Sequence, residues 1–390
     1  MLKKYCEDCA LPESFHVQSW IEEIRRSLLP QPRIFRRLEP FFAFLLERFF
    51  RIIGLVKMES NFSLFDIQAR SACFIKEARA RGVEFKAAKG PFGYTNHFWA
   101  EVHGRQVTFD SLPLAGHVGK HDISFVDCKE RTKKYLEKGN FPIAAGKFFW
   151  FWQEKQALNY GISKLGFPLV VKPRGGSVAR HVTTDIGNEK GLKLAINKAI
   201  VYSPVFTVER FIGDAFVHRA TVVDFDYVAV VRQEPASVTG DGKSTIQELA
   251  TEKNNSRVEN PVLHKIVIDK TTAACLNERN YDLKTVLRMG EAVYLQKDPF
   301  VRLGGDLCEV TSGVHPDNLQ LFKDIAKFFD MRLVGIDFMV LDISKSWRNQ
   351  ETAVLELNSA PCIEVHQYPS SGKPQNVARA VSDLFFKYYL

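Results

Sequence analysis

The sequence of 390 residues predicts an α+β fold with mostly antiparallel strands. From residue 126 onward, short runs rich in β-branched residues and bounded by glycines alternate with helical segments. Hydrophobic residues make up 45% of the chain and charged residues 25%, as in an average soluble globular protein. This composition excludes a disordered chain, a collagen-like chain and a polytopic membrane protein. The length fits two or three domains, and 31 phenylalanines indicate a largely aromatic core.

The formal net charge of +8 suits nucleic acid, an anionic membrane, or phosphate and carboxylate substrates. No block of like charges occurs, so we expect dispersed surface charge and no nucleic-acid partner. The opening MLKKYCEDCA carries acids where a secretory signal has its apolar run, which favours a cytoplasmic protein with seven reduced cysteines. Cys6 and Cys9 form a CxxC without a second pair, and the sequence favours free thiols there over zinc.

Residues 1–60 are predicted to form a helical extension. Between Arg33 and Met58 apolar residues recur at near-helical spacing, but Glu47, Arg48 and Arg51 interrupt them. The apolar run therefore falls short of the ~18–20 residues that cross a bilayer. A helix packed on the protein body is the favoured interpretation, since aromatic stripes usually belong to a core. A helix lying in a membrane interface, with peripheral membrane contact through 33–58, is the other.

Residues 61–125 are predicted to form a small α/β domain. A helical pattern runs from Phe65 to Arg81 and ends at Gly82, the expected stop signal. A strand over Val83–Ala87 follows, and then a hairpin formed by His97–Val102 and Gln106–Phe109. Because this domain has no glycine-rich phosphate loop, we expect it to support or orient substrate.

The rest of the chain, 126–390, is expected to form one further domain with a flexible middle lobe at about 151–212. Its predicted strands are Leu169–Val171, Val205–Val208, Thr221–Phe225, Val228–Val231, Val334–Leu341 and Ala353–Leu357.

Three oxygen-bearing side chains near the end of the chain are candidate metal ligands. Asp337 lies in the apolar strand LVGIDFMVLDI, where a lone carboxylate is costly unless it is bound. Glu356 and Asn358 in AVLELNSAP point to the same face, because strand side chains alternate. Hard oxygen ligands suit Mg²⁺. The alternative is that these are buried acids paired with lysine or arginine.

Two lysines supply the matching positive charge. Lys172 closes the strand in FPLVVKPRGG, beside a glycine-containing loop, and Lys129 lies in FVDCKERTKKYL. A lysine in such a place is well positioned to meet nucleotide phosphates, although surface lysines are common.

The order of these segments resembles the ATP-grasp superfamily, and within it the ATP-grasp region of cyanophycin synthetases. After Lys129 come FPIAAG, VVKPRGG, TVERFIG, RQEPASVTGDGKSTIQEL, GGDLCEVTSGVHPDN, GIDFMVLDI and ELNSAP, in unbroken order over roughly 126–390. The Mur-ligase-like half of cyanophycin synthetases has no counterpart here. The resemblance implies two α+β lobes that enclose ATP. It also implies phosphoryl transfer to a carboxylate, followed by amine attack, to give an amide, ADP and phosphate. Related enzymes are often homo-oligomers.

The resemblance also assigns roles to individual residues. The nucleotide ligands it implies are Lys129 and Lys172 at the phosphates, Glu209 with the backbone of Arg210, Phe211 and Ile212 at the adenine, and Asp214 at the ribose. Two Mg²⁺ ions, or Mn²⁺ in their place, are expected at Asp337, Glu356 and Asn358. Candidates for stabilising the transferring group are Arg219, Arg232 and the backbone of Gly304 and Gly305.

The sequence departs from this pattern in two places. In the loop 174–182, Ala179 and His181 stand where glycines are usual, which motivates the alternative of a catalytically impaired ATP-binding regulatory or scaffolding protein. A kinase-like enzyme that stops at a phosphorylated product is a further alternative. In the acceptor region, Arg302 and Glu364 replace residues of different charge. We expect Arg302 to bind a substrate carboxylate and Glu364 to favour a cationic amine, and the carboxylate and amine to be amino acids or short peptides.

Overall fold

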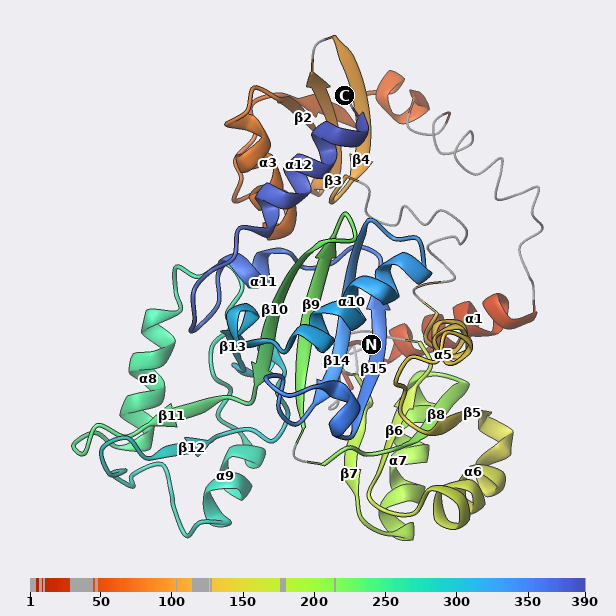
Figure 1. Ribbon diagram of the computed structural model, residues 1–390, viewed down its shortest axis with the longest axis vertical. Helices are drawn as coiled ribbons and strands as arrows, with labels where there is room; N and C mark the ends of the chain where they lie inside the picture. Colours follow the sequence, from red (N-terminus) through yellow and green to blue (C-terminus); the bar gives the residue numbers. More distant parts are fainter. Residues whose placement is uncertain are drawn as a thin grey trace. The chain divides into compact units, whose positions relative to one another are not determined.

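The computed structural model describes residues 5, 6, 9, 11–28, 45, 48–102, 104–113, 126, 128–175, 180–213 and 215–389. The chain divides into two compact units (Figure 1). Unit 1 comprises residues 1–57, 124–215 and 352–356, and unit 2 comprises residues 58–123, 216–351 and 357–390. Both contain helices packed on antiparallel sheets, which confirms the predicted α+β class. The predicted domain boundaries at 60 and 125 stay a prediction.

Unit 1 is built on a four-stranded antiparallel sheet of order β5-β8-β6-β7. Its strands are β5 (Gly146–Trp150), β6 (Leu169–Pro173), β7 (Thr183–Ile186) and β8 (Val205–Arg210). Strands β6 and β8 were predicted, and both alternate or bury apolar residues against the helices. The core between sheet and helices includes Leu169, Val171 and Phe206, all fully buried.

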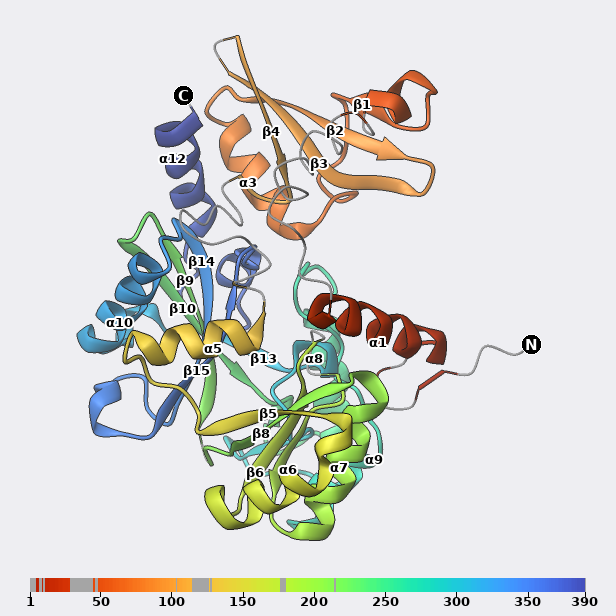
Figure 2. The same ribbon diagram turned by 90° about the vertical axis from the view of Figure 1, so that its right-hand side faces the viewer.

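Unit 1 also contains helices (Figure 2). They are α1 (Glu13–Leu28), α5 (Lys129–Lys138), η1 (Phe151–Gln153), α6 (Glu154–Tyr160), η2 (Gly161–Leu165) and α7 (Glu189–Tyr202). Of these, α7 packs on β6, β7 and β8, α6 packs on β5, and α1 packs on α7. Helix α7 begins where the Asn188 side chain accepts a hydrogen bond from the Gly191 amide, a standard N-cap. It buries Leu192, Ile196 and Ala199 against β6 and β8.

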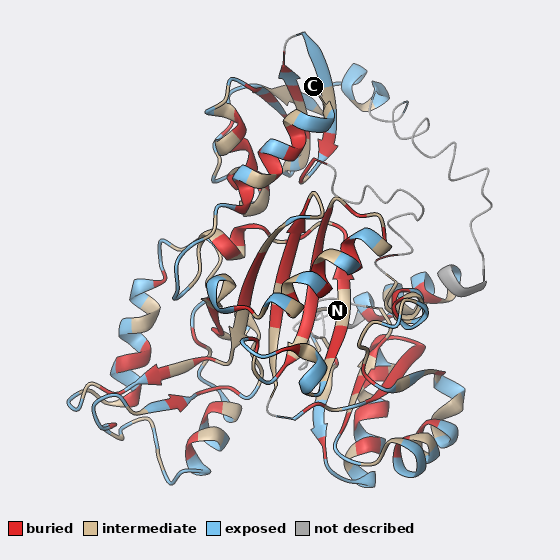
Figure 3. Cartoon of the chain, in the orientation of Figure 1, coloured by how far each residue is buried: buried red, intermediate tan, exposed pale blue. Residues whose placement is uncertain are grey.

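The central sheet of unit 2 has five strands in the order β13-β10-β9-β14-β15. They are β9 (Phe216–Val223), β10 (Tyr227–Glu234), β13 (Asp306–Glu309), β14 (Leu333–Val340) and β15 (Thr352–Asn358). Their long buried runs stand out in Figure 3. The chain passes from unit 1 to unit 2 within β15, between Glu356 and Leu357. The predicted strand Thr221–Phe225 ends earlier, because Asp224 and Phe225 have φ of 49° and 65° and form the turn into β10.

Helices and a small hairpin complete this part of unit 2. The helices are α8 (Ile246–Ser256), α9 (Lys270–Asn277), η3 (Val301–Leu303), η4 (Thr311–Gly313), α10 (Pro316–Phe328), η5 (Trp347–Asn349) and α11 (Glu364–Gln367). Strands β11 (Ser237–Thr239) and β12 (Ala292–Tyr294) pair antiparallel next to α8 and α9. Helix α10 lies on the central sheet, where Phe322 packs against Phe338 at 5.3 Å.

The segment 58–113 of unit 2 contains a helix and most of a four-stranded sheet. Helix α3 (Ala69–Arg79) precedes the sheet β1-β2-β3-β4, and Gly82 ends the turn after the helix with φ of 85°. The strands are β1 (Lys57–Glu59), β2 (Glu84–Gly90), β3 (Gly93–Val102) and β4 (Arg105–Asp110), and the predicted hairpin is β3–β4. The C-terminal helix α12 (Val377–Tyr389) packs on α3, with Phe74 and Phe385 at 5.6 Å. Such contacts form the predicted aromatic core.

Most of the predicted segment 33–58 lies outside the described residues. In its described part, Phe49, Ile52 and Ile53 are 53%, 75% and 50% exposed. The favoured interpretation, a stripe packed on the body, therefore does not hold for these three side chains. Among the described helices, none combines the length and apolarity needed to cross a bilayer.

Candidate functional site

A buried carboxylate in unit 1 binds two lysines. The Glu209 carboxylate, at the end of β8, accepts a hydrogen bond from Lys133 Nζ at 2.6 Å and forms an ion pair with Lys172 Nζ at 2.7 Å. The β6–β8 register pairs Val170 with Glu209, so Lys172, two residues further along β6, lies on the same face. Both predicted positions, Lys172 and Glu209, are thus brought together.

Gly146 on β5 makes room for this carboxylate. It lies opposite Glu209 in the β5–β8 pair. A Cβ atom at position 146 would meet the Glu209 Cγ at 2.5 Å and the Val208 carbonyl oxygen at 2.6 Å. Both distances are shorter than real contacts, so a side chain here would displace Glu209. This explains the glycine that ends FPIAAG.

The two lysines control the charge of Glu209. Burial alone raises the pKa of its carboxyl, but the ammonium groups of Lys172 and Lys133 outweigh burial and lower the pKa to about 2. Burial also lowers the pKa of Lys133, against the opposing effect of Glu209. Two basic side chains therefore face a single carboxylate in this group, an excess of one basic group.

A second ion pair lies beside the first. Lys129 Nζ is 3.3 Å from Glu356 Oε2, which joins a predicted phosphate ligand to a predicted metal ligand. Glu356 reaches this place because Val354 of β15 bridges Ile143 in unit 1. A small pocket of about 10 Å³ opens here, lined by Lys129, Lys133, Ala144, Phe148, Lys172, Glu209, Val354 and Leu355.

Lys133 is a site residue that the sequence analysis missed. It lies four residues after Lys129 on α5, and positions i and i+4 share one helix face. That spacing, within the lysine-rich segment KERTKKYLEK, was the signal that could have found it.

Two backbone amides of the predicted adenine hinge donate hydrogen bonds to other parts of the protein. The amide of Arg210 donates to the Ala145 carbonyl at 2.8 Å, and the amide of Phe211 donates to the Pro168 carbonyl at 3.1 Å. Ile212, the last hinge residue, is buried. A base at this segment would therefore use the Ile212 amide or backbone carbonyls. Asp214, the predicted ribose ligand, lies outside the described residues.

In unit 2, Arg219 forms an ion pair with the predicted metal ligand Asp337. The two residues face each other in the β9–β14 register, and two guanidinium nitrogens donate to the two carboxylate oxygens. Gly335 lies on the same face, where an added Cβ would be 3.4 Å from both Arg219 Cδ and Asn358 Cβ. The predicted ligand Asn358 is thus next to this pair, and its amide nitrogen is buried without a hydrogen-bond partner among the described residues.

Arg232 does not join this group. The β9–β10 register pairs Val231 with Arg219 and Arg232 with His218, so the two arginines lie on opposite faces of the sheet. Arg232 instead pairs with Glu234 and lies over the Phe216 ring at 4.9 Å. The structure thus does not bring together the two arginines expected to act on one transferring group.

Gly304 and Gly305 serve close packing. An added Cβ at Gly304 would lie 2.3 Å from the Ile266 Cα, and one at Gly305 would lie 2.8 Å from the Glu234 carbonyl oxygen. Their amides donate to the carbonyls of Val301 and Phe300. The donors expected for an oxyanion are therefore occupied within the loop in this conformation.

The two predicted substrate residues differ in burial. Arg302 is exposed in η3, with its guanidinium 5.4 Å from the Phe300 ring. Glu364 is buried, and one carboxylate oxygen has no hydrogen-bond partner among the described residues. Burial raises the pKa of Glu364, against the opposing charge of Arg70. Arg70 of α3 donates a hydrogen bond at 2.7 Å to the carbonyl of Ala360, which lies shortly before Glu364 in the sequence.

The sequence of this chain is similar to those of known proteins. No family model matches the chain. It is 32% identical over 349 residues to a cyanophycin synthetase of Crocosphaera subtropica, across 85% of this chain and 39% of the relative. It is 23% identical over 334 residues to a glutathione biosynthesis bifunctional protein of Clostridium perfringens, across 82% of this chain and 41% of the relative. The chain thus spans about two fifths of the length of these relatives.

Among solved structures, a bifunctional glutathione synthetase from Pasteurella multocida is similar in fold. The TM-score is 0.62 at 19% identity, with 83% of this chain and 44% of the other chain covered.

Replacing Glu209 by glutamine tests the buried charge group. Loss of the carboxylate leaves two buried ammonium groups unpaired, so we expect Glu209→Gln to lower the free energy of unfolding by about 3–5 kcal/mol at pH 7. A depressed carboxyl pKa stabilises the fold above its ordinary value of 4.5 and loses this effect as pH falls towards about 2. The difference between wild type and variant, measured by urea unfolding, should therefore shrink across that window.

The matched control is Glu189→Gln, which changes an exposed acid on α7 of the same unit. It should change the unfolding free energy by no more than about 0.5 kcal/mol. A Glu209 variant as stable as wild type at pH 7 would contradict the account, as would a difference that persists in acid.

Proposed function

We propose that this ATP-grasp protein, a homologue of the cyanophycin synthetases over 85% of its length, is an ATP-dependent carboxylate–amine ligase. Its membership of the ATP-grasp superfamily and its ATP-grasp fold are as the sequence predicted. In the proposed reaction ATP phosphorylates a substrate carboxylate, and an amine attacks the acyl phosphate. The products are an amide, ADP and phosphate.

The observation that carries this proposal is the pocket of unit 1. Three lysines line it against the single carboxylate of Glu209, and one of them, Lys129, pairs with Glu356. Phosphoryl transfer needs positioning and neutralisation of phosphate charge more than covalent chemistry from the protein. Cations that are fixed in place before the nucleotide arrives supply both, because they need no reorganisation.

The predicted metal ligands fit Mg²⁺ in their chemistry. Asp337 and Glu356 offer carboxylate oxygens, and Asn358 offers an amide oxygen, all hard ligands of the kind Mg²⁺ takes. Each carboxylate has a basic partner in the structure, Arg219 for Asp337 and Lys129 for Glu356. When bound, Mg²⁺ would neutralise and orient the phosphate oxygens of ATP. We propose that two Mg²⁺ ions bind here and that Mn²⁺ can replace them.

The protein's own residues have separable tasks in this scheme. Lys129 and Lys172 hold the phosphates, and the segment 209–212 holds the adenine. Arg219, beside Asp337, neutralises charge on the transferring group. We assign no step to Arg232 or to the amides of Gly304 and Gly305 in this scheme, because Arg232 lies on the other face of the sheet from Arg219 and the amides donate within their loop.

For the acceptor, we propose that Glu364 selects a cationic amine and Arg302 a carboxylate. The buried carboxylate of Glu364 with an unsatisfied oxygen is a strong site for an ammonium group, which would supply the missing hydrogen bond. Amino acids or short peptides carry both groups. Arg70 connects α3 to this region, in line with the expected supporting role of 61–125.

A catalytically impaired ATP-binding protein is the second candidate. His181 stands where a glycine is usual in the phosphate loop. It is buried, at 2% exposure, and has φ of 55°. A fixed side chain at this position restricts how the loop approaches phosphate.

Release of ADP distinguishes these candidates. Purified protein is incubated with ATP and Mg²⁺ against amino acids, dipeptides and polyamines, singly and in pairs. We expect release to require one carboxylate and one amine together. Glu356→Ala should lower the rate ~10²–10³-fold, since removing a metal ligand costs about 3–4 kcal/mol of charge stabilisation. Lys134→Ala, an exposed lysine on α5 paired with Glu130, should leave the rate unchanged.

Release that needs no amine would support the kinase-like alternative instead. ATP binding without release from any pair would support the impaired protein, and equal rates in wild type and Glu356→Ala would remove the proposed metal ligand.

Amine selectivity tests Glu364. Glu364→Gln keeps the shape but removes the charge, so kcat/KM for a cationic amine should fall about 10–100-fold relative to a neutral amine. Arg302→Gln should act in the same way on an anionic substrate. Glu278→Gln, an exposed acid paired with Lys297 at 2.8 Å, is the control and should leave the ratio unchanged. Unchanged selectivity in both the Glu364 and Arg302 variants would refute the assignment.

A further inference from the structure

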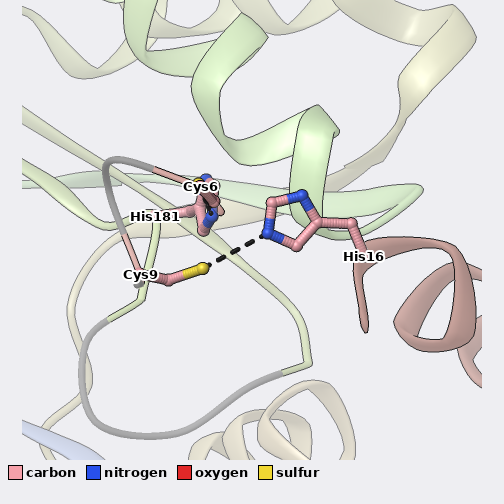
Figure 4. Close-up of side chains that lie close together, drawn as sticks. All are labelled: Cys6, Cys9, His16 and His181. Atoms are coloured by element: carbon pink, nitrogen blue, oxygen red, sulfur yellow. Dashed lines mark hydrogen bonds between the residues drawn. The ribbon is translucent and has the colours of Figure 1, made fainter. Parts of the chain in front are cut away.

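Four side chains of types that bind metals lie close together in unit 1, and none of them lines the pocket of lysines (Figure 4). Cys6, Cys9, His16 and His181 each place one ligand atom within 4.8 Å of the other three. Cys6 Sγ lies 3.6 Å from His181 Nε2, and Cys9 Sγ lies 3.3 Å from His16 Nε2. We propose that these residues form a structural zinc site that ties the N-terminal segment to the segment preceding β7.

The two sulfur–nitrogen distances agree with a tetrahedral zinc ion. Zinc lies about 2.3 Å from sulfur and about 2.0–2.1 Å from nitrogen, so neighbouring ligands of a tetrahedron are about 3.3–3.8 Å apart. Both sulfur–nitrogen distances fall in or at this range. Two thiolates and two imidazoles in a tetrahedral arrangement are typical of zinc. Four protein ligands leave no open position, which indicates a structural role.

The local fold presents the first three ligands together. The amide of Cys6 donates to the Leu11 carbonyl at 2.8 Å, and Tyr5 bridges Pro12. The chain therefore folds back on itself around the CxxC. Helix α1 begins at Glu13, directly after this turn, and its first turn carries His16.

His181 is held in the orientation that a metal ligand needs. Its Nδ1 lies 3.0 Å from the Lys198 carbonyl oxygen, an acceptor only, so Nδ1 carries the proton. The lone pair of Nε2 then points towards Cys6, as in zinc ligands whose second nitrogen donates to a backbone carbonyl. The Tyr202 ring stacks on His181 at 5.1 Å and meets His16 at 5.6 Å. These contacts position both imidazoles.

The site explains an unusual residue in the phosphate loop. His181 is buried and has a positive φ, a conformation that costs free energy for a non-glycine residue. A metal bond would offset that cost. Further along α1, Glu23 forms an ion pair with Arg174, and the Trp20 indole donates a hydrogen bond to the Ile200 carbonyl at 2.9 Å. Zinc would thus complete the attachment of α1 to this part of unit 1.

Metal content tests the site directly. The full chain is purified without a metal-affinity step, dialysed against zinc-free buffer and analysed by elemental mass spectrometry. We expect about one zinc ion per chain. The double variant Cys6→Ser with Cys9→Ser should lose at least about nine tenths of it, since both thiolate ligands are removed. Cys275→Ser, a half-buried cysteine on α9 outside the cluster, should retain it.

A second measurement does not depend on whether the double variant folds. The zinc of wild type is exchanged for Co²⁺, and the visible spectrum is recorded. Tetrahedral coordination by two thiolates should give intense visible bands and a thiolate-to-metal charge-transfer band, and the variant Cys9→His should keep the metal but weaken the charge-transfer band. Wild type without zinc and without these bands would overturn the proposal and leave two thiol–imidazole hydrogen bonds. Full zinc content in the double serine variant would also overturn it.

Discussion

The pocket of unit 1 depends on one constraint, that buried charges must be paired. Glu209 is almost fully buried, and folding can tolerate its charge only because Lys133 and Lys172 bind both of its oxygens. Helix α5 and strands β6 and β8 must therefore converge on one point, and Gly146 must leave room for the carboxylate. The excess positive charge that remains is what makes the pocket suitable for phosphate.

The same constraint links the resting protein to the proposed chemistry. In the pairs Lys129 with Glu356 and Arg219 with Asp337, a cation proposed to bind phosphate contacts an acid proposed to bind metal. Each charge is satisfied before substrates bind, so the fold is stable without them. Binding of ATP and Mg²⁺ would then exchange these partners, phosphate for the carboxylates at the cations and metal for the cations at the carboxylates. The charged groups needed for phosphoryl transfer would therefore already be gathered before the substrates bind.

Local signals predicted the parts of the site that lie within single strands. Lys172 and Asp337 could be predicted from the local sequence because each ends or interrupts a short apolar run, whereas Glu209 was assigned only by the family resemblance. Features set between strands were not predicted: the face of Arg232 follows from the register with β9, and the amides of Gly304 and Gly305 are occupied by loop contacts. The sequence did not predict that His16 and His181 lie beside the CxxC, because His181 is 175 residues from Cys6 in the sequence. Only the folded chain shows that this CxxC has partners.

Positional isotope exchange tests whether ATP activates the substrate carboxylate. ATP labelled with heavy oxygen in the bridge between the β- and γ-phosphates is incubated with enzyme, Mg²⁺ and the carboxylate alone. Reversible formation of an acyl phosphate frees the β-phosphate of bound ADP to rotate, so the account predicts that label moves to non-bridging positions without any amine. Turnover with carboxylate and amine but no such exchange with the carboxylate, under conditions where ADP stays bound, would contradict it.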